Sequence, residues 1–205
     1  MADCRSEAFA SLVRRAQACR SCDRMDGRTR ALGPGNGPLD ARILFVAEAP
    51  GRLGADRTGV PLQGDATGRN FEELLAAAEL NRDAVFITNA VLCNPRDAAG
   101  RNVRPAALEL QNCREKLVAT VQIIDPLWVV ALGAVALATL GRIGGHGLSL
   151  ATHVATAHPW RGRWLVPMYH PGPRSVARRG RGAHLEDYRR LGRLIRGGDG
   201  ATSSR

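Results

Sequence analysis

The sequence predicts an α/β fold: a single-domain, three-layer αβα sandwich around a central, mainly parallel four-stranded sheet. Short apolar runs without polar alternation recur along the chain, as is typical of strands buried on both faces. Segments with apolar residues at helical spacing lie between these runs, and such alternation indicates a parallel sheet. We assign residues 1–196 to one domain and residues 197–205 to a disordered tail.

The first half of the chain supplies two strands and two helices of this fold. The first helix is expected at 6–18, because apolar residues recur there at helical spacing. The apolar run at 41–49 predicts the first strand, which ends at Glu48 and the sequence Ala-Pro-Gly. After a glycine-rich loop, 68–80 predicts a helix with Phe71, Leu74 and Leu75 on one face, and 84–93 predicts the second strand.

The second half repeats the pattern. Pro105 suits the first turn of a helix at 105–124, since proline fixes a helical φ and lacks only a donor that would be unused. Strands are expected at 127–133 and 163–171, and a short helix lies between them at 134–140. The last helix is expected at 183–196, with Leu185, Tyr188, Leu191 and Ile195 facing inward.

Composition narrows the class of protein. The chain has 205 residues and is 44% hydrophobic, which suits one domain with a real core. No apolar run approaches the roughly 20 residues that cross a bilayer, and the first residues lack the order of a secretory signal. We therefore expect a cytoplasmic protein, a monomer with no membrane partner.

The charge of the chain predicts a polyanionic partner. The net charge is +10 and the pI is about 10.8, which favours nucleic acid. Arginine suits phosphate because its planar fork donates two hydrogen bonds at once. The last quarter of the chain is especially rich in it: Arg174, Arg178, Arg179, Arg181, Arg189, Arg190, Arg193 and Arg196.

Three polar residues sit where predicted strands end. Glu48, Asn89 and His170 each lie near the end of a different strand. In a parallel sheet the carboxyl ends of the strands lie along one edge, which is where ligands bind. We therefore expect the three side chains to meet in one crevice. A second His-Pro pair, His158-Pro159, is an alternative for the histidine of this crevice. We prefer His170 because it follows an apolar strand.

The cysteines indicate a metal site rather than disulfides, which are rare in the cytoplasm. Cys19 and Cys22 form a close chelating pair, Cys93 ends a strand, and Cys113 lies on the next predicted helix. Four thiolates suit either a structural zinc ion or a [4Fe–4S] cluster. Cys93 and Cys113 could equally be core residues, and Cys4 has no partner in this scheme.

The order of several short motifs resembles a known family. These motifs are Glu48-Ala-Pro-Gly51, the loop from Arg57 to Gly68 containing RTG and GDATG, Ile87-Thr-Asn89-Ala-Val, Leu132-Gly133 and Tyr169-His-Pro-Gly172, with the four cysteines interleaved. Together they resemble the uracil-DNA glycosylase superfamily, in particular its iron–sulfur families 4 and 5, from about residue 19 to 194. EAPG and ITNAV resemble family 4, whereas the 57–68 loop resembles family 5.

This resemblance implies a monofunctional DNA glycosylase that flips uracil out of DNA and hydrolyses its N-glycosidic bond. It also favours [4Fe–4S] over zinc at the four cysteines. One position departs from family 4, which usually has an aromatic residue stacked on the flipped base where this chain has Leu62. The only lysine, Lys116, is expected near the cysteines rather than the strand ends, so no Schiff base is expected.

The resemblance also implies a role for each residue of the crevice. Asn89 would read the base edge with its amide, which both donates and accepts, and His170 would donate to the base O2. Glu48 would activate water or stabilise the sugar cation. The structural alternatives are an Asn that caps a strand end, a His fixed beside Pro171, and a Glu paired with an arginine.

Further residues are implied around these three. Asp65 is a second candidate carboxylate, although it is equally well placed to cap the helix that follows. Ala49, Gly51 and Leu62 are expected to line the pocket. The loop after His170 is expected to enter DNA, with Arg174 as a wedge beside the gap left by the flipped base and Ser175 as a further DNA-binding residue. Phosphates would be held by Arg178 and Arg179.

Three other functions are compatible with the sequence. The main substrates could be the deaminated purines hypoxanthine and xanthine, as the family 5 features suggest. The chain could also be a non-catalytic iron–sulfur DNA-binding module. A zinc-stabilised hydrolase of small nucleotides is the third alternative.

Overall fold

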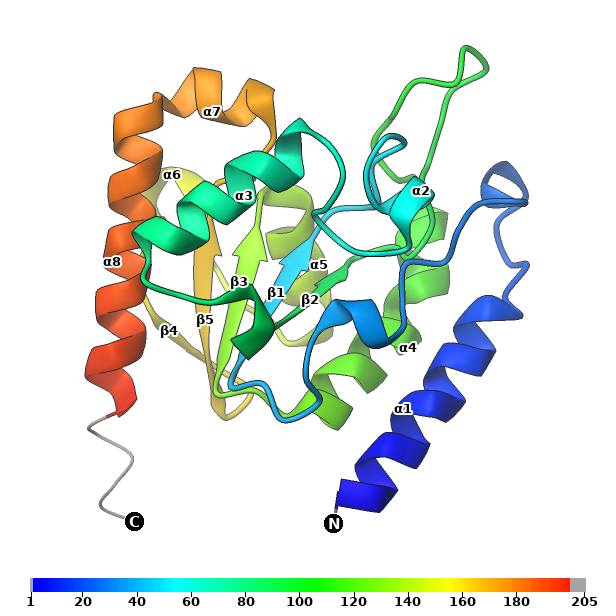
Figure 1. Ribbon diagram of the computed structural model, residues 1–205, viewed down its shortest axis with the longest axis horizontal. Helices are drawn as coiled ribbons and strands as arrows, with labels where there is room; N and C mark the ends of the chain where they lie inside the picture. The colour runs from blue at the N-terminus through cyan, green and yellow to red at the C-terminus, as the bar shows by residue number, and fades with distance from the viewer. Residues whose placement is uncertain (1, 200–205) are drawn as a thin grey trace.

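The computed structural model describes residues 2–199 and shows one three-layer α/β domain (Figure 1). Its sheet has the order β2-β1-β3-β5-β4, in which only β4 runs antiparallel to its neighbour. The strands are β1 (Ile43–Ala47), β2 (Val85–Asn89), β3 (Trp128–Leu132), β4 (His158–Trp160) and β5 (Arg163–Met168). The predicted fold class is confirmed, but the prediction of four strands is wrong by one. The additional strand, β4, has three residues with Pro159 in the middle, and so gives no apolar run.

Helices join and cover the strands. They are α1 (Ala2–Gln17), α2 (Ala55–Thr58), α3 (Ala66–Ala77), α4 (Ala107–Ile124), α5 (Ala134–Ile143), α6 (Leu150–His153), α7 (Pro173–Arg179) and α8 (Arg181–Asp199), with 3-10 turns at Asp23–Met25, Pro34–Asn36 and Arg82–Ala84. The sequence did not predict α2, α6 or α7, each of which has at most seven residues. In the predicted tail, residues 197–199 continue α8, and residues 200–205 lie outside the described residues.

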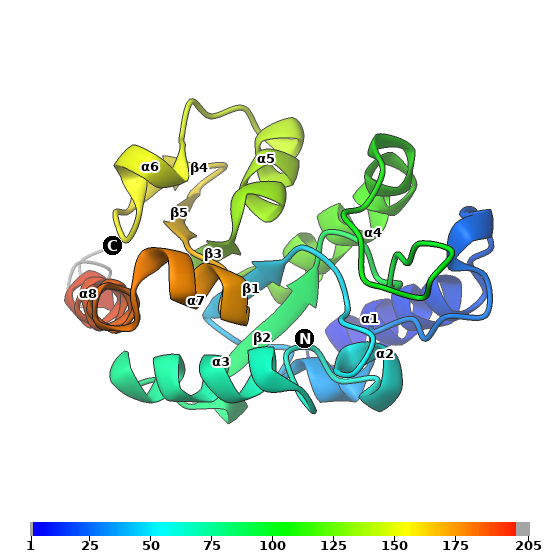
Figure 2. The ribbon, with the colours of Figure 1, turned by 90° about the horizontal axis from the view of Figure 1, so that it is seen from above.

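Two apolar cores lie on the two faces of the sheet (Figure 2). On one face α1, α4 and α5 pack against Leu44, Val46 and Val129. On the other face α3 and α8 pack against Phe45 and Val130. Successive residues of β1 thus point into opposite cores, which explains why its sequence is apolar throughout. Each buried Leu or Phe side chain contributes roughly 1.5–3 kcal/mol.

The strand order creates a place for a ligand. The chain leaves β1 for β2 on one side and later returns to β3 on the other side of β1. Such a reversal opens a crevice beyond the carboxyl ends of the central strands. In Figure 1 these ends point upward, toward α2, α7 and the hairpin at 94–103.

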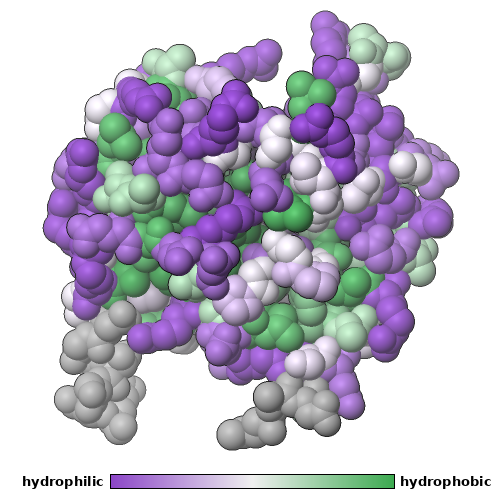
Figure 3. All heavy atoms as spheres, in the orientation of Figure 1, coloured by the Kyte–Doolittle hydropathy of each residue, from purple (hydrophilic) through white to green (hydrophobic). Residues whose placement is uncertain are grey.

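The surface is mainly polar. Hydrophilic side chains cover most of the face in Figure 3, and the large hydrophobic residues exposed within 2–199 are Leu53, Leu108 and Trp164. Over the same residues, no helix combines the length and apolar character required to traverse a bilayer.

Candidate active site

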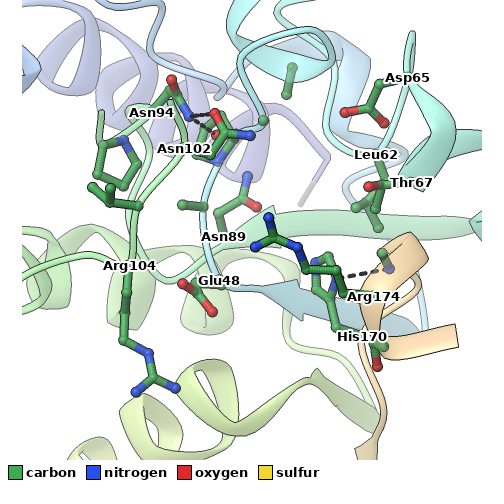
Figure 4. A pocket seen from close by; sticks show the side chains of 18 of the residues that line it. Glu48, Leu62, Asp65, Thr67, Asn89, Asn94, Asn102, Arg104, His170 and Arg174 are labelled. Atoms are coloured by element: carbon green, nitrogen blue, oxygen red, sulfur yellow. Dashed lines mark hydrogen bonds between the residues drawn. The ribbon is translucent and has the colours of Figure 1, made fainter. Parts of the chain in front are cut away.

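A pocket of about 570 Å³ lies beyond the carboxyl ends of β1, β2 and β5 (Figure 4). The loop after β1, the start of α3, the hairpin after β2 and the start of α7 all contribute to its wall. It contains most of the site residues that the sequence predicts: Glu48, Ala49, Gly51, Leu62, Asp65, Asn89, His170, Arg174 and Ser175. The three strand-end residues therefore do converge.

Asn89 is the last residue of β2 and pairs in register with Ala47 of β1. Its side chain is only 2% exposed, yet its Nδ2 has no hydrogen-bond partner among the described residues. Such an unpaired buried donor costs about 1–3 kcal/mol, so an acceptor from a ligand or from water in the pocket would stabilise it. No bond from this donor makes Asn89 a strand cap among the described residues, and the Nδ2 group is available to a ligand.

His170 follows β5 and is held in one tautomer by the backbone. Its Nδ1 accepts a hydrogen bond of 3.0 Å from the N–H of Gly172. Burial lowers its pKa to about 4, Asp65 opposes this effect and His184 adds to it. At neutral pH the ring is therefore uncharged and carries its proton on Nε2, which makes Nε2 a donor.

Close backbone contacts fix the ring further. A Cβ at Gly172 would lie 2.9 Å from the His170 Nδ1, and one at Gly133 would lie 3.3 Å from the His170 Cβ. Gly133 also has a φ of +95°, which disfavours other residues. The competitor His158 lies on the edge strand β4, outside this pocket, and contacts Thr156.

Glu48 directly follows β1 and is partly buried in the pocket wall. Burial raises its pKa, and Arg104 across the wall counteracts that rise. Among the described residues no ion pair joins Glu48 to an arginine within 4 Å, so the alternative of a structural ion pair is not favoured. The carboxylate is poorly solvated and faces the pocket, where it can bind water or a cation.

Asp65 acts as a helix cap. Its Oδ1 accepts a hydrogen bond of 2.9 Å from the N–H of Gly68, at the start of α3. Its Oδ2 lies against the turn after β1, where a Cβ at Gly54 would approach it to 2.7 Å. The structural alternative thus describes Asp65 well, although the residue also borders the pocket.

Leu62 is 9% exposed and has a φ of +50°, a left-handed conformation that is uncommon for a leucine. Arg82 holds this turn by donating to the carbonyl oxygens of Pro61 and Leu62, and it also pairs with Glu72. Gly68 packs directly on the turn, since a Cβ there would lie 2.7 Å from the Leu62 oxygen. The side chain contributes an apolar surface to the pocket but no aromatic ring.

The arginines after His170 divide into two groups. Arg174 and Ser175, at the start of α7, line the pocket, and Arg178 is exposed further along the helix. Arg179 instead makes a bidentate ion pair with the buried Asp187, in which its Nε and Nη2 each lie 2.9 Å from a carboxylate oxygen. Its guanidinium also stacks over the ring of Tyr169. The structure therefore does not favour the predicted role of Arg179 in holding phosphate.

Three of the four predicted metal-ligating cysteines pack close together, and the fourth, Cys19, is near enough to influence the pKa of Cys93. Cys22, Cys93 and Cys113 pack in one small cluster with Met25 and Val91. Burial raises the pKa of Cys93 to about 11, and the thiols of Cys113, Cys19 and Cys22 raise it further while Arg30 opposes them. Asn112 donates to the Cys22 sulfur at 3.3 Å. The exposed Cys4 lies apart on α1.

The chemistry of this thiol set suits a soft metal or a cluster, and Asn112 already donates to one sulfur. In the arrangement described for residues 2–199, however, no three His, Cys, Asp or Glu side chains are close enough to hold a metal ion. The residue types thus suit a cluster, but the thiols as arranged in the described residues do not form a metal-binding group.

Sequence reasoning missed part of the pocket wall. Asn94 and Asn102, from the hairpin after β2, line it, as does Arg104 directly after that hairpin. The sequence shows this hairpin only as a polar loop rich in Pro, Arg and Gly. An Asn directly after Cys93, before a proline, was the one local sign of a specific turn.

Comparison with known proteins identifies the family. The sequence model of the uracil DNA glycosylase superfamily matches residues 34–191. A type-4 uracil-DNA glycosylase of Thermotoga maritima is 34% identical over 82% of this chain and 83% of its own length. One from Archaeoglobus fulgidus is 31% identical over 92% and 94%. A type-5 enzyme of Thermus thermophilus is 33% identical over 80% and 85%. This chain therefore belongs to the uracil DNA glycosylase superfamily.

Proposed function

We propose that this protein is a monofunctional uracil-DNA glycosylase, which releases uracil from DNA and leaves an abasic site for base excision repair. One observation carries the proposal: the unpaired amide donor of Asn89 and the fixed, neutral ring of His170 meet in one pocket. The names of the relatives, type-4 and type-5 uracil-DNA glycosylase, support it.

Asn89 recognises the flipped base. Its free Nδ2 donates to the O4 of uracil and its carbonyl oxygen accepts from N3–H, a pairing that cytosine cannot offer. The buried donor gains its missing partner only when the base is in place, and this increases the discrimination against an unmatched base. Leu62 supplies an apolar surface against the ring.

His170 stabilises the departing base. As the bond between the sugar C1′ and the base N1 breaks, its electron pair goes to the base and negative charge builds on O2. The neutral imidazole donates its Nε2–H to this oxygen without prior protonation. The fixed Nδ1 bond keeps the donor aimed into the pocket, so little reorganisation is needed.

Glu48 acts on the sugar side. Positive charge develops on the deoxyribose as the base leaves, and a carboxylate in a poorly solvated wall stabilises that charge strongly. The same carboxylate orients a water molecule whose oxygen bonds to C1′. This water loses a proton as its oxygen bonds to C1′. The base, which left with the electron pair of the broken bond, takes up a proton and becomes free uracil. Asp65, already engaged as a cap, has a lesser part in this scheme.

DNA would lie across the carboxyl ends of the strands. Arg174 is placed to fill the gap left by the flipped base, and Ser175 and the exposed Arg178 to bind the flanking backbone. Lys116 donates to a carbonyl beside the cysteines, on α4, and is too distant in the fold to act as a Schiff base. We therefore expect no strand cleavage.

Cys19, Cys22, Cys93 and Cys113 would hold a [4Fe–4S] cluster. The group would supply a structural cross-link between the segment after α1, the end of the β2 segment and α4. A zinc ion at the same thiols is the alternative, and it differs in lacking visible absorbance.

A second candidate activity is removal of the deaminated purines hypoxanthine and xanthine. The specific observation is Leu62, whose side chain leaves more of the 570 Å³ pocket open than an aromatic ring would. Both type-4 and type-5 enzymes occur among the relatives, which is compatible with either base class.

Parallel single-turnover reactions on oligonucleotides containing uracil, hypoxanthine or xanthine test both activities. Release of uracil alone supports the first proposal, and release of purines as well supports the wider pocket. If no base is released although the purified protein binds DNA in a salt-sensitive way, the chain is a binding module instead.

A further inference from the structure

A pair of asparagines that the proposed chemistry does not use holds the turn after β1. Asn94 is 1% exposed, and its Nδ2 donates to the Pro50 oxygen at 2.6 Å and to the Asn102 Oδ1 at 3.0 Å. The same Asn102 oxygen accepts from the N–H of Arg52 at 3.1 Å. The two peptide groups on either side of Gly51 are thus hydrogen-bonded to Asn94 and Asn102, which are also bonded to each other (Figure 4).

The hairpin behind this pair is braced. Arg96 donates from Nε to the Asn94 Oδ1, and it pairs with the largely buried carboxylate of Asp56 on α2. A backbone bridge between Arg96 and Asn102 and a bond from the N–H of Val103 to the Pro95 oxygen close the hairpin. Asn94 therefore has a carbonyl partner, an amide partner and a guanidinium partner, which leaves it little freedom.

The turn that is held contains Glu48. The N–H of Val91 donates to the Glu48 carbonyl oxygen at 3.2 Å, so the segment that follows β2 fixes the turn at residues 48, 50 and 52. Asn94 also directly follows Cys93, so the cysteine-bearing segment and the Glu48 turn are mechanically joined.

We propose that Asn94 and Asn102 are positioning residues that set the location of the Glu48 carboxylate relative to the flipped nucleotide. This inference rests on the proposed function. A displacement of about 1 Å in a catalytic group can lower the rate by roughly 100-fold, and the residues that prevent it need not touch the substrate.

Substitution by aspartate is expected to have opposite consequences at positions 94 and 102. Asn94→Asp keeps the shape and the acceptor for Arg96 but removes both donated bonds. Asn102 takes part only through its Oδ1, which accepts from the Arg52 N–H. Asn102→Ala therefore loses this hydrogen bond, whereas Asn102→Asp keeps it. Asn81→Asp, at an exposed 3-10 cap at the other end of β2, controls for added negative charge.

The test is single-turnover uracil release at saturating protein, with DNA affinity measured separately. We expect Asn94→Asp to lower the rate about 100-fold and Asn102→Ala about 10-fold, each with less than about threefold change in Kd. Asn102→Asp should restore most of the activity that Asn102→Ala loses. An Asn94→Asp rate within about twofold of Asn81→Asp overturns the proposal.

Hydrogen exchange of the peptide covering residues 48–54 gives a readout that does not depend on activity. We expect faster exchange in Asn94→Asp and Asn102→Ala, and the wild-type rate in Asn102→Asp. Unchanged exchange in all three overturns the positioning role. If the wild type releases no base but exchange responds as expected, the proposed function is wrong. The conclusion that Asn94 and Asn102 hold the turn after β1 is then still supported.

Discussion

Asn89 and His170 derive their chemistry from local structure rather than from residue type alone. An Asn at a strand end is ordinary, but one whose buried Nδ2 lacks a partner among the described residues is costly to keep. A His is also ordinary, until the Gly172 N–H occupies Nδ1 and leaves Nε2 as the donor. The sequence predicts both residues, but neither hydrogen-bonding state, because those depend on neighbours distant in the chain.

Asn89→Asp is expected to abolish base recognition with little change in shape. It replaces the free donor by an acceptor facing O4, so single-turnover uracil release should fall by about 100-fold or more. Asn81→Asp, which alters an exposed residue remote from the pocket, is the matched control. Equal rates for the two variants would show that the Asn89 amide does not read the base.

Glu48→Gln is expected to change the pH dependence of the reaction. Because burial raises the pKa of Glu48, its charge and the rate should fall at a higher pH than for an exposed glutamate as the solution is acidified. His170, with a pKa of about 4, stays neutral over the same range. The variant should therefore be slow and show no acidic limb between about pH 5 and 8.

A stability measurement accompanies this one. A carboxyl whose pKa is raised in the folded protein opposes folding once it ionises, so Glu48→Gln should raise Tm at pH 7 and have less effect near pH 4. An acidic limb that persists in the variant would assign the pH dependence to another group.

At the scale of elements, the structure gives Asp65, at the N-cap of α3, and Arg179, on α7, partners that the sequence did not reveal. The sequence left Asp65 as either a catalyst or a cap, and it predicted that Arg179 binds phosphate. The structure pairs Asp65 with the Gly68 N–H and Arg179 with Asp187. Sequence could not settle these choices, since Arg179 and Asp187 approach each other only after α7 turns into α8.

The cap role of Asp65 predicts different results for two substitutions. Serine also caps helices, so Asp65→Ser should keep Tm and most of the rate, whereas Asp65→Ala should lose about 1 kcal/mol of unfolding free energy. Chemical denaturation and single-turnover kinetics measure the two effects. A rate loss of more than about 100-fold in Asp65→Ser would instead make this carboxylate catalytic.

Arg178 and Arg179 are neighbours with different expected effects. Arg178→Ala should weaken DNA binding uniformly and reduce the salt slope of log K by about 1, because one phosphate contact is lost. Arg179→Ala should leave that slope unchanged. It should lower the unfolding free energy by about 2–3 kcal/mol, because the buried carboxylate of Asp187 would lose its ion-pair partner. Salt titrations and denaturation curves of both variants separate these roles, and a reduced slope in Arg179→Ala would contradict the assignment.

The helices and parallel strands were largely predictable because each buries a regular apolar face. Phe71, Leu74 and Leu75 do face the core from α3, and Tyr188 and Leu191 do so from α8. The elements that were missed are short and polar. The seven-residue α7 and the three-residue β4 are held by neighbouring elements, which local patterns cannot reveal.

For the whole molecule, net charge does not by itself locate a surface for DNA. Of the arginines in the last quarter, Arg181 pairs with Glu73 on α3, Arg189 and Arg193 pair with Glu186, and Arg196 pairs with Glu79. These four arginines pair with three glutamates, so the positive charge along α8 is partly compensated. The basic residues that face the pocket, Arg104 and Arg174, are few but lie at the carboxyl ends of the strands.

The cysteines are expected to stabilise the whole molecule through the proposed cluster. Cys113→Ser should remove an absorbance band at about 400 nm from anaerobically purified protein and lower Tm by several degrees. Cys4→Ser, on the exposed side of α1, should change neither. A wild-type protein with bound zinc and no visible band would replace the cluster by a zinc site.

The most direct test of the proposed activity is single-turnover base release from labelled single- and double-stranded oligonucleotides carrying uracil, hypoxanthine, xanthine or a G·T mismatch, with alkali to reveal abasic sites. Our assignment predicts free uracil, an alkali-labile site and an intact strand before alkali, with the signal lost in Asn89→Asp. No base release from any substrate, by folded protein that binds DNA, would contradict it.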